Sequence, residues 1–210
     1  MSGPTRTLAA FDVDGTLTAR DTLAPFLARI VGRTALVRAA AANAPRLAPI
    51  ALGRGDRDAT KERMLVRLLR GRPYEPIATA GAAYGREIAA DRVAPAMHER
   101  IAWHLEQDHE VVLVSASLGT YLDEVARVLG ASTALCTRLE VDDDGHCTGR
   151  MIGGNCRGAA KADRLLAHIG RGDATIYAYG DSRGDDELLA LADHAFRVRH
   201  TRGGVRCTEE

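Results

Sequence analysis

The chain has 210 residues, 46% of them hydrophobic, so it can bury a sizeable core as one domain with an insertion or as two small domains. Its 28 basic and 28 acidic side chains give a formal net charge of zero, which excludes a global attraction to nucleic acid or to an anionic membrane surface. No apolar run reaches the roughly 18 residues of a membrane helix, and the start MSGPTRT is unlike a signal peptide. We therefore expect a cytoplasmic protein with no stable membrane insertion and no nucleic-acid partner.

The first predicted element is a buried strand at residues 7–12, which leads into the acidic turn DVDGTLT. An EF-hand calcium loop counted from Asp12 would need an acid at position 5 and a glutamate at position 12, and these positions hold Thr16 and Leu23. One Asp after a strand is ordinary turn or cap chemistry. Two acids at Asp12 and Asp14 instead indicate a metal-binding turn, or a nucleophile beside its acid partner.

A helical insertion is predicted next, over residues 19–94, because almost a hundred residues separate the first strand from the second. Its apolar positions recur at helical spacing in two groups, which are Leu23, Phe26, Leu27, Ile30 and Val31, and then Met64, Leu65, Leu68 and Leu69. The insertion holds 14 Lys or Arg and 7 Asp or Glu, so it is basic while the rest of the chain is acidic. Either its helices are simply well solvated, or a basic lid covers a site for an anion.

The remaining elements alternate between strands and helices. Met97, Ile101 and Leu105 mark a helix that returns the chain to the sheet. Short apolar runs predict strands at 110–114, 174–179 and 195–198, and helical patterns cover 118–129 and 159–169. Residues 138–151 are typical of a β-hairpin around Asp144-Gly145. This alternation favours a parallel α/β sheet, whose ligands bind beyond the carboxyl ends of the strands.

Polar residues follow three of these strands, at Asp12, Ser115 and Asp181, so we expect them to converge at one edge of the sheet. The four cysteines form no CxxC pair, which argues against structural zinc and favours free thiols.

The motifs of this chain resemble those of the haloacid dehalogenase (HAD) superfamily. The turn DVDGTLT resembles its first motif, Ser115 after VVLV the second, Lys161 the third, and Asp181 with Asp185 in GDSRGDDELL the fourth. An insertion between the first two motifs is similar to subfamily IB and its phosphoserine-phosphatase-like branch. The resemblance implies a Rossmann-like parallel α/β core at 1–18 and 95–210, with an α-helical C1-type cap at 19–94.

The resemblance also implies a phosphatase that uses Mg²⁺ and an aspartyl-phosphate intermediate. Asp12 would be the nucleophile, Asp14 the general acid and base, and Ser115, Lys161 and Thr16 would hold the phosphoryl group. A divalent cation offsets the repulsion between a carboxylate nucleophile and a dianionic phosphate. Its predicted ligands are Asp12, the backbone carbonyl of Asp14, Asp181 and Asp185, the last acting through water or through Lys161.

The substrate would be a small phosphomonoester. In the resembling phosphatases a glutamate holds the substrate amine, and Asp21 stands at its position; Leu65 stands where they carry a carboxylate-binding arginine. Lys61, Arg63 or Arg67 could replace that arginine, and Arg63 with Asp21 are our predicted substrate contacts in the insertion. Histidinol phosphate, a sugar phosphate and a lysolipid phosphate stay open as substrates, the last because residues 35–52 are apolar. A phosphotransferase, a non-catalytic phosphate-binding module and a homodimer also stay open.

Overall fold

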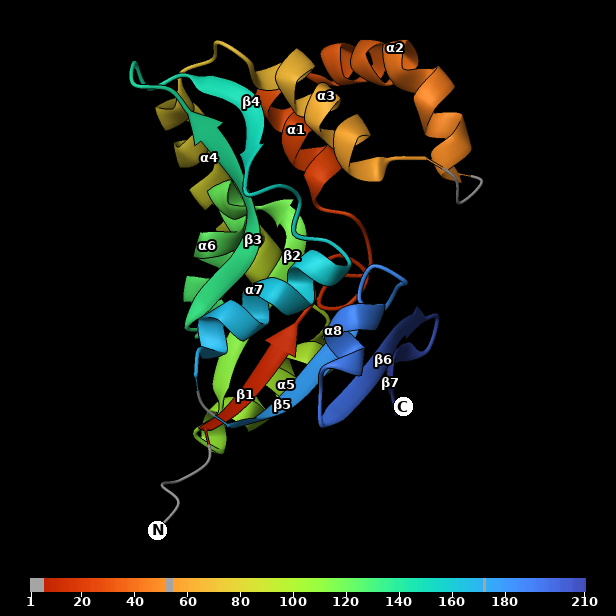
Figure 1. The fold of residues 1–210 in the computed structure, drawn as a ribbon, viewed down its shortest axis with the longest axis vertical. Coiled ribbons are helices and arrows are strands. Elements are labelled where there is room, and N and C mark those ends of the chain that lie inside the picture. The colour runs from red at the N-terminus through yellow and green to blue at the C-terminus, as the bar shows by residue number, and fades with distance from the viewer. Residues whose placement is uncertain (1–5, 52–54, 172) are drawn as a thin grey trace.

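A mostly parallel sheet forms the centre of the molecule (Figure 1). The computed structural model describes residues 6–51, 55–171 and 173–210, and for residues 46–51 it describes the backbone alone. Within these residues the sheet has seven strands in the order β4-β3-β2-β1-β5-β6-β7. The strands are β1 (Arg6–Phe11), β2 (Glu110–Leu118), β3 (Thr133–Val141), β4 (Cys147–Ile152), β5 (Ala174–Gly180), β6 (His194–Thr201) and β7 (Gly204–Glu209).

The central strand β1 is buried on both faces, as expected for a strand with parallel neighbours on each side. Alternate residues point to opposite faces, so Ala9 and Phe11 join one apolar cluster, while Leu8 and Ala10 join the other. The first cluster includes residues of α5 (Pro95–Glu106) and α6 (Gly119–Leu129), and the second includes residues of α7 (Ala159–Ile169) and α8 (Asp186–Ala190). The predicted α/β class is therefore confirmed.

The second strand differs from its prediction. We expected it to end at Ser115, but β2 continues to Leu118 because residues 115 and 118 pair with adjacent residues of β3, Cys136 and Thr137. Two extra residues, 116 and 117, therefore form a bulge in β2. The predicted hairpin is present, but its first strand begins earlier, at Thr133, and runs on as a parallel strand of the main sheet.

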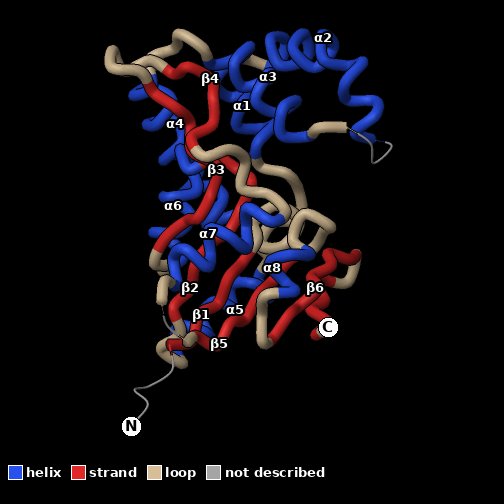
Figure 2. The backbone as a smooth tube through the Cα atoms, viewed as in Figure 1, coloured by secondary structure: helices blue, strands red, loops and turns tan. Residues whose placement is uncertain are grey.

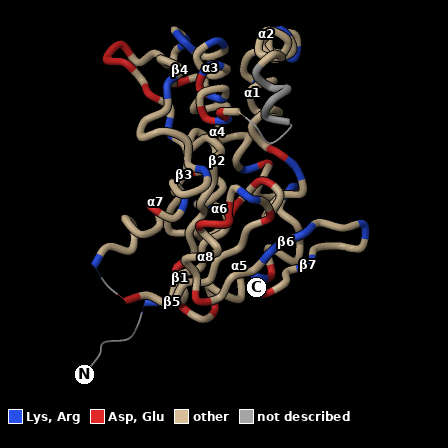
Figure 3. Tube along the Cα trace, turned by 45° about the vertical axis from the view of Figure 1, so that its right-hand side comes forward, with Lys and Arg blue, Asp and Glu red and all other residues tan. Residues whose placement is uncertain are grey.

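The segment between β1 and α5 is helical, as predicted (Figure 2). It contains α1 (Leu23–Val31), α2 (Arg33–Ala51), α3 (Arg57–Leu69), α4 (Tyr74–Glu87) and a π-helical turn (Ile88–Arg92). Lys and Arg positions recur along these helices (Figure 3). The two ends of the segment lie side by side, because Thr18 forms a bridge with Val93, and Ala94 N donates to Leu17 O at 2.9 Å.

Glycines allow the helical segment to pack closely on the rest of the molecule at two of its contacts. Helix α4 packs on α6 through glycines, since a Cβ on Gly81 would lie 2.3 Å from the carbonyl oxygen of Thr120. Helix α3 packs on β4, where a Cβ on Gly149 would lie 2.3 Å from the Cα of Val66. The division into a core and a cap domain stays a prediction.

Three further expectations concern the chain as a whole. All four cysteines are free thiols. The helix predicted from Met97, Ile101 and Leu105 is present as α5, where Met97 and Ile101 are buried and Leu105 is exposed. Among the described residues, no helix combines the length and apolarity needed to cross a bilayer. The suggested lipid contact of residues 35–52 falls partly on residue 52 and on the side chains of 46–51, which lie outside the described residues.

Candidate active site

Three carboxylates meet where β1 and β5 end. These strands are parallel neighbours, and Asp12 N donates to Tyr179 O at 2.9 Å, so Asp12 and Asp181 leave the sheet at the same edge. Asp185 follows one turn later, at the start of α8. One carboxylate oxygen from each of Asp12, Asp181 and Asp185 lies within 4.8 Å of the others. The predicted convergence of acids at the strand ends is therefore present.

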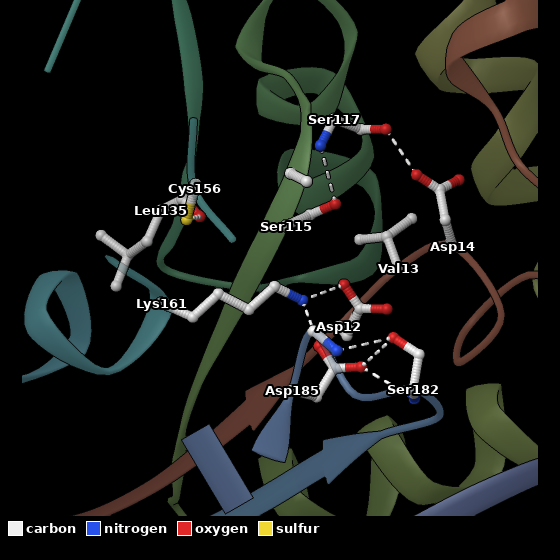
Figure 4. Close-up of polar contacts among 12 residues, drawn as sticks. Asp12, Val13, Asp14, Ser115, Ser117, Leu135, Cys156, Lys161, Ser182 and Asp185 are labelled. Atoms are coloured by element: carbon white, nitrogen blue, oxygen red, sulfur yellow. Dashed lines mark hydrogen bonds and ion pairs between the residues drawn. The ribbon is translucent and has the colours of Figure 1, made fainter. Parts of the chain in front are cut away.

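Lys161 lies inside this acidic cluster. It comes from α7, and its Nζ donates to Asp12 Oδ1 and, at 2.5 Å, to Asp185 Oδ1 (Figure 4). Lys161, Asp12 and Asp185 are all buried. Burial opposes the charge of the lysine, but the two carboxylates outweigh it and raise the pKa of Lys161. Burial raises the pKa of Asp12 to about 7, although Lys161 acts in the opposite direction.

Two polar atoms beside this cluster are buried without a hydrogen-bond partner among the described residues: Asp181 Oδ1 and Thr16 Oγ1. Buried polar atoms are normally paired, so both of these atoms are available to bind a ligand. A cluster of carboxylate oxygens is the donor set that Mg²⁺ prefers, and these residues therefore fit a magnesium ion. The absence of a side chain at Gly15 leaves space for the Asp181 carboxylate, because a Cβ there would lie 2.4 Å from Asp181 Oδ2. Gly15 also has φ of +93°, a backbone conformation that favours glycine.

Asp14 is held apart from the cluster, and its carboxylate points in a different direction from that of Asp12 (Figure 4). Asp14 Oδ1 accepts from Thr22 N at 2.7 Å, and Oδ2 accepts from the hydroxyl of Ser117. Thr22 in turn shares a 2.9 Å hydrogen bond with the buried Tyr121 hydroxyl. Burial raises the pKa of Asp14, so its carboxyl group keeps its proton to a higher pH than an exposed aspartate does.

The bulge in β2 gives its two serines different positions. Ser115 is buried, and its Oγ accepts from Ser117 N at 3.1 Å, while Ser117 uses its own hydroxyl on Asp14. Ser117, only two residues after Ser115, is a second candidate for binding the phosphoryl group. Because the Ser117 hydroxyl binds Asp14, it is not available for the phosphoryl group, and Ser115 stays the predicted phosphoryl contact.

Lys61, a cation on α3 of the helical segment, binds to the sheet. From α3, its Nζ donates to Ala116 O in the bulge and to Asn155 Oδ1 at 2.7 Å, and lies 3.4 Å from Thr137 Oγ1. Asn155 donates to Asp58 Oδ1 at 2.7 Å, which closes a network between α3 and the core. Burial lowers the pKa of Lys61 to about 8. Sequence reasoning named Lys61 only as an alternative to Arg63.

The two predicted substrate contacts of the helical segment lie apart. Asp21 is exposed, and its Oδ2 accepts from Ala24 N at 2.9 Å in the first turn of α1, while Asp21 also lines a hollow between α1 and α3. Arg63 is exposed and lines a different hollow, with Val66 and Arg150. The structure therefore does not bring Arg63 to the acidic cluster.

A cavity of about 600 Å³ lies at Ser182, the residue after Asp181. Three arginines, Arg57, Arg157 and Arg183, line it together with Asp56, the N-cap of α3, and Asp58 in the first turn of that helix. The arginine side chains favour an anionic ligand next to the carboxylate cluster.

The fold and the acidic cluster define a class of enzyme that the comparisons with known proteins identify. The family model for haloacid dehalogenase-like hydrolase matches residues 9–190, and the chain belongs to this family of hydrolases.

Two curated relatives and one solved structure refine this assignment. Protein CicA of Caulobacter vibrioides is 33% identical over 190 residues, which cover 89% of this chain and 83% of CicA. A "Probable phosphatase" of Mycobacterium tuberculosis is 32% identical over 209 residues, which cover 94% of this chain and 70% of that protein. A substrate-bound phosphoserine phosphatase shares the fold, with a TM-score of 0.61 at 21% identity, over 90% of this chain and 84% of that one. The resemblance to the haloacid dehalogenase family is confirmed.

Proposed function

We propose that this protein is a Mg²⁺-dependent phosphomonoesterase that hydrolyses a small phosphorylated metabolite through an aspartyl-phosphate. The observation that carries the proposal is the pairing of a buried cluster, Asp12 with Lys161, Asp181 and Asp185, and a separately held acid, Asp14. A site that only bound phosphate would have no need of the second acid. The relative named as a probable phosphatase supports the same reaction class.

In the first step an oxygen of Asp12 attacks phosphorus, and the bond between phosphorus and the alcohol oxygen breaks. Asp14 gives its proton to the leaving alkoxide, so the products are a free alcohol and phosphorylated Asp12. In the second step Asp14 takes a proton from water, and the water oxygen attacks phosphorus. The bond between phosphorus and Asp12 then breaks, which releases phosphate and restores both carboxyl groups.

Lys161 and Ser115 would hold the phosphoryl oxygens during both steps, one by charge and one by its hydroxyl, and Thr16 Oγ1 offers a further donor. The positive charge of Lys161 is fixed in place by two buried carboxylates, so it needs no reorganisation when the phosphoryl group arrives. Asp12, Asp181 and Asp185 would hold the magnesium ion with the backbone carbonyl of Asp14. When bound, that ion offsets the negative charge of the phosphate.

The test is release of phosphate from p-nitrophenyl phosphate. Turnover should require Mg²⁺ and should fall at least about a thousandfold in Asp12→Asn, because this variant lacks the nucleophile. Asp143→Asn is a matched control, since Asp143 is exposed in the turn between β3 and β4. Undiminished turnover in Asp12→Asn would show that another group attacks phosphorus.

A further inference from the structure

A hollow of about 400 Å³ lies between α1 and α3. Its walls are mainly hydrocarbon, and they include Leu23 and Leu27 of α1 with Met64 and Leu65 of α3. Its polar lining residues are Asp21, Arg57, Thr60 and Lys61. A concave, mostly apolar site of this volume with a few polar groups is typical of a small-molecule pocket.

The hollow lies next to Asp14. Thr22, which stands between the lining residues Asp21 and Leu23, donates its backbone N–H to Asp14 Oδ1 at 2.7 Å. On the other side, Lys61 binds the carbonyl of Ala116, and the following residue, Ser117, donates its hydroxyl to Asp14 Oδ2. Both ends of the Asp14 carboxylate are therefore held by segments that adjoin the walls of the hollow.

Two of the charged groups at the hollow, Lys61 and Asp21, already form hydrogen bonds within the protein, and the third, Arg57, is exposed at the start of α3 and also lines the cavity at Ser182. The Lys61 ammonium has three hydrogens and three acceptors, on Ala116, Asn155 and Thr137. Asp21 Oδ2 accepts a hydrogen bond from Ala24 N in the first turn of α1. What the hollow offers a ligand is mainly the apolar surface of its leucines and methionine. An ammonium or carboxylate placed against that surface would lose its hydration without gaining a matching partner.

We propose that this hollow holds the leaving group, and that the preferred substrates are phosphate monoesters of aliphatic alcohols rather than of amino acids. The inference rests on the proposed function, since Asp14 must lie beside the alcohol oxygen to protonate it. The phosphoryl group then lies beside Asp12, where Lys161 and Ser115 would hold it. The hydrocarbon part of the alcohol extends from Asp14 between α1 and α3. Its burial favours binding in proportion to the apolar area removed from water.

The test compares ethyl, n-butyl and n-hexyl phosphate with phosphoserine at saturating Mg²⁺. Each methylene accommodated should raise kcat/KM roughly fourfold, the effect of burying one CH₂ group. Hexyl phosphate should therefore exceed both ethyl phosphate and phosphoserine. Met64→Gln, which places an amide in the wall at similar size, should flatten this chain-length dependence. Arg70→Gln is the matched control, because Arg70 ends the same helix, is exposed and lines a different hollow.

The outcomes separate the two proposals. Mg²⁺-dependent hydrolysis of p-nitrophenyl phosphate without a chain-length dependence, or with phosphoserine as the best ester, would overturn the aliphatic assignment and leave the phosphatase standing. No hydrolysis of any ester would overturn the phosphatase itself. Calorimetry then still examines the hollow, because n-hexylphosphonate should bind at least tenfold more tightly than methylphosphonate, and equal binding of the two would refute an apolar pocket.

Discussion

The separate position of Asp14 makes a sharp prediction for the variant Asp14→Asn. The amide oxygen can still accept from Thr22 N, which lies 2.7 Å from Asp14 Oδ1. The amide nitrogen faces the hydroxyl of Ser117, which can accept a hydrogen bond as well as donate one. Both contacts survive, so we expect the free energy of unfolding to change by no more than about 1 kcal/mol. The one property removed is the transferable proton.

The size of the effect should depend on the leaving group. An alkoxide needs a proton as it leaves, and a positioned general acid contributes about 10²- to 10⁴-fold, or about 3–5 kcal/mol of barrier. p-Nitrophenolate is stable as an anion and leaves without a proton. Asp14→Asn should therefore slow hydrolysis of n-butyl phosphate by about 10²- to 10⁴-fold and that of p-nitrophenyl phosphate by less than about tenfold.

The assay measures the first turnover for both esters in wild type, Asp14→Asn and the control Asp143→Asn, over a range of pH. Burial raises the pKa of Asp14, and the acid must be protonated to act, so the wild-type rate with n-butyl phosphate should fall as pH rises through that pKa. The fall should be absent in Asp14→Asn. Equal losses for the two esters would refute the role of Asp14 as a proton donor to the alcohol.

Three further predictions concern the scaffold around the site. Gly15→Ala should abolish Mg²⁺-dependent turnover and cost about 1–2 kcal/mol in urea unfolding, because φ is +93° and the new Cβ would lie 2.4 Å from Asp181; retained turnover would contradict this. Burial lowers the pKa of His104 to about 4 from 6.5, so the unfolded chain takes up its proton first. The free energy of unfolding is therefore highest above pH 6.5 and declines by up to about 3 kcal/mol as pH falls to 4. This dependence on pH should be weaker in His104→Gln, and an unchanged dependence would show that another group causes it. Gly81→Ala should lower the free energy of unfolding by about 1–3 kcal/mol, although alanine normally stabilises a helix interior, because its Cβ would lie 2.3 Å from Thr120 O; a gain in thermal stability would show that α4 and α6 can separate without cost.

The acidic cluster could be predicted from the sequence because its members follow apolar strands of a parallel sheet. Such strands end at one edge, so Asp12 and Asp181 had to meet there. The bulge in β2 could not be predicted, because SAS has no pattern that distinguishes a strand end from an irregular continuation. It is fixed by pairing with Cys136 and Thr137, which lie about twenty residues away.

The network around Lys61 was also beyond local reasoning. Its partners Ala116 and Asn155 lie 55 and 94 residues further along the chain, and a single lysine with a single asparagine forms no motif. Lys61 and Arg63 are both cations that could replace the missing arginine, but residues two apart on a helix point in different directions. The packing of α3 on β4 turns Lys61 toward the core and leaves Arg63 exposed.

The bond from Lys61 to the bulge has a consequence for engineering this enzyme. Ala116, whose carbonyl Lys61 holds, has Ser115 on one side and Ser117 on the other. A redesign that shifted α3 to widen the pocket would therefore also move the phosphoryl contact and the hydroxyl that holds Asp14. Selectivity and turnover are mechanically linked through this one ammonium group. Retargeting the enzyme should keep Lys61 in place and vary only positions that face the pocket, such as Met64.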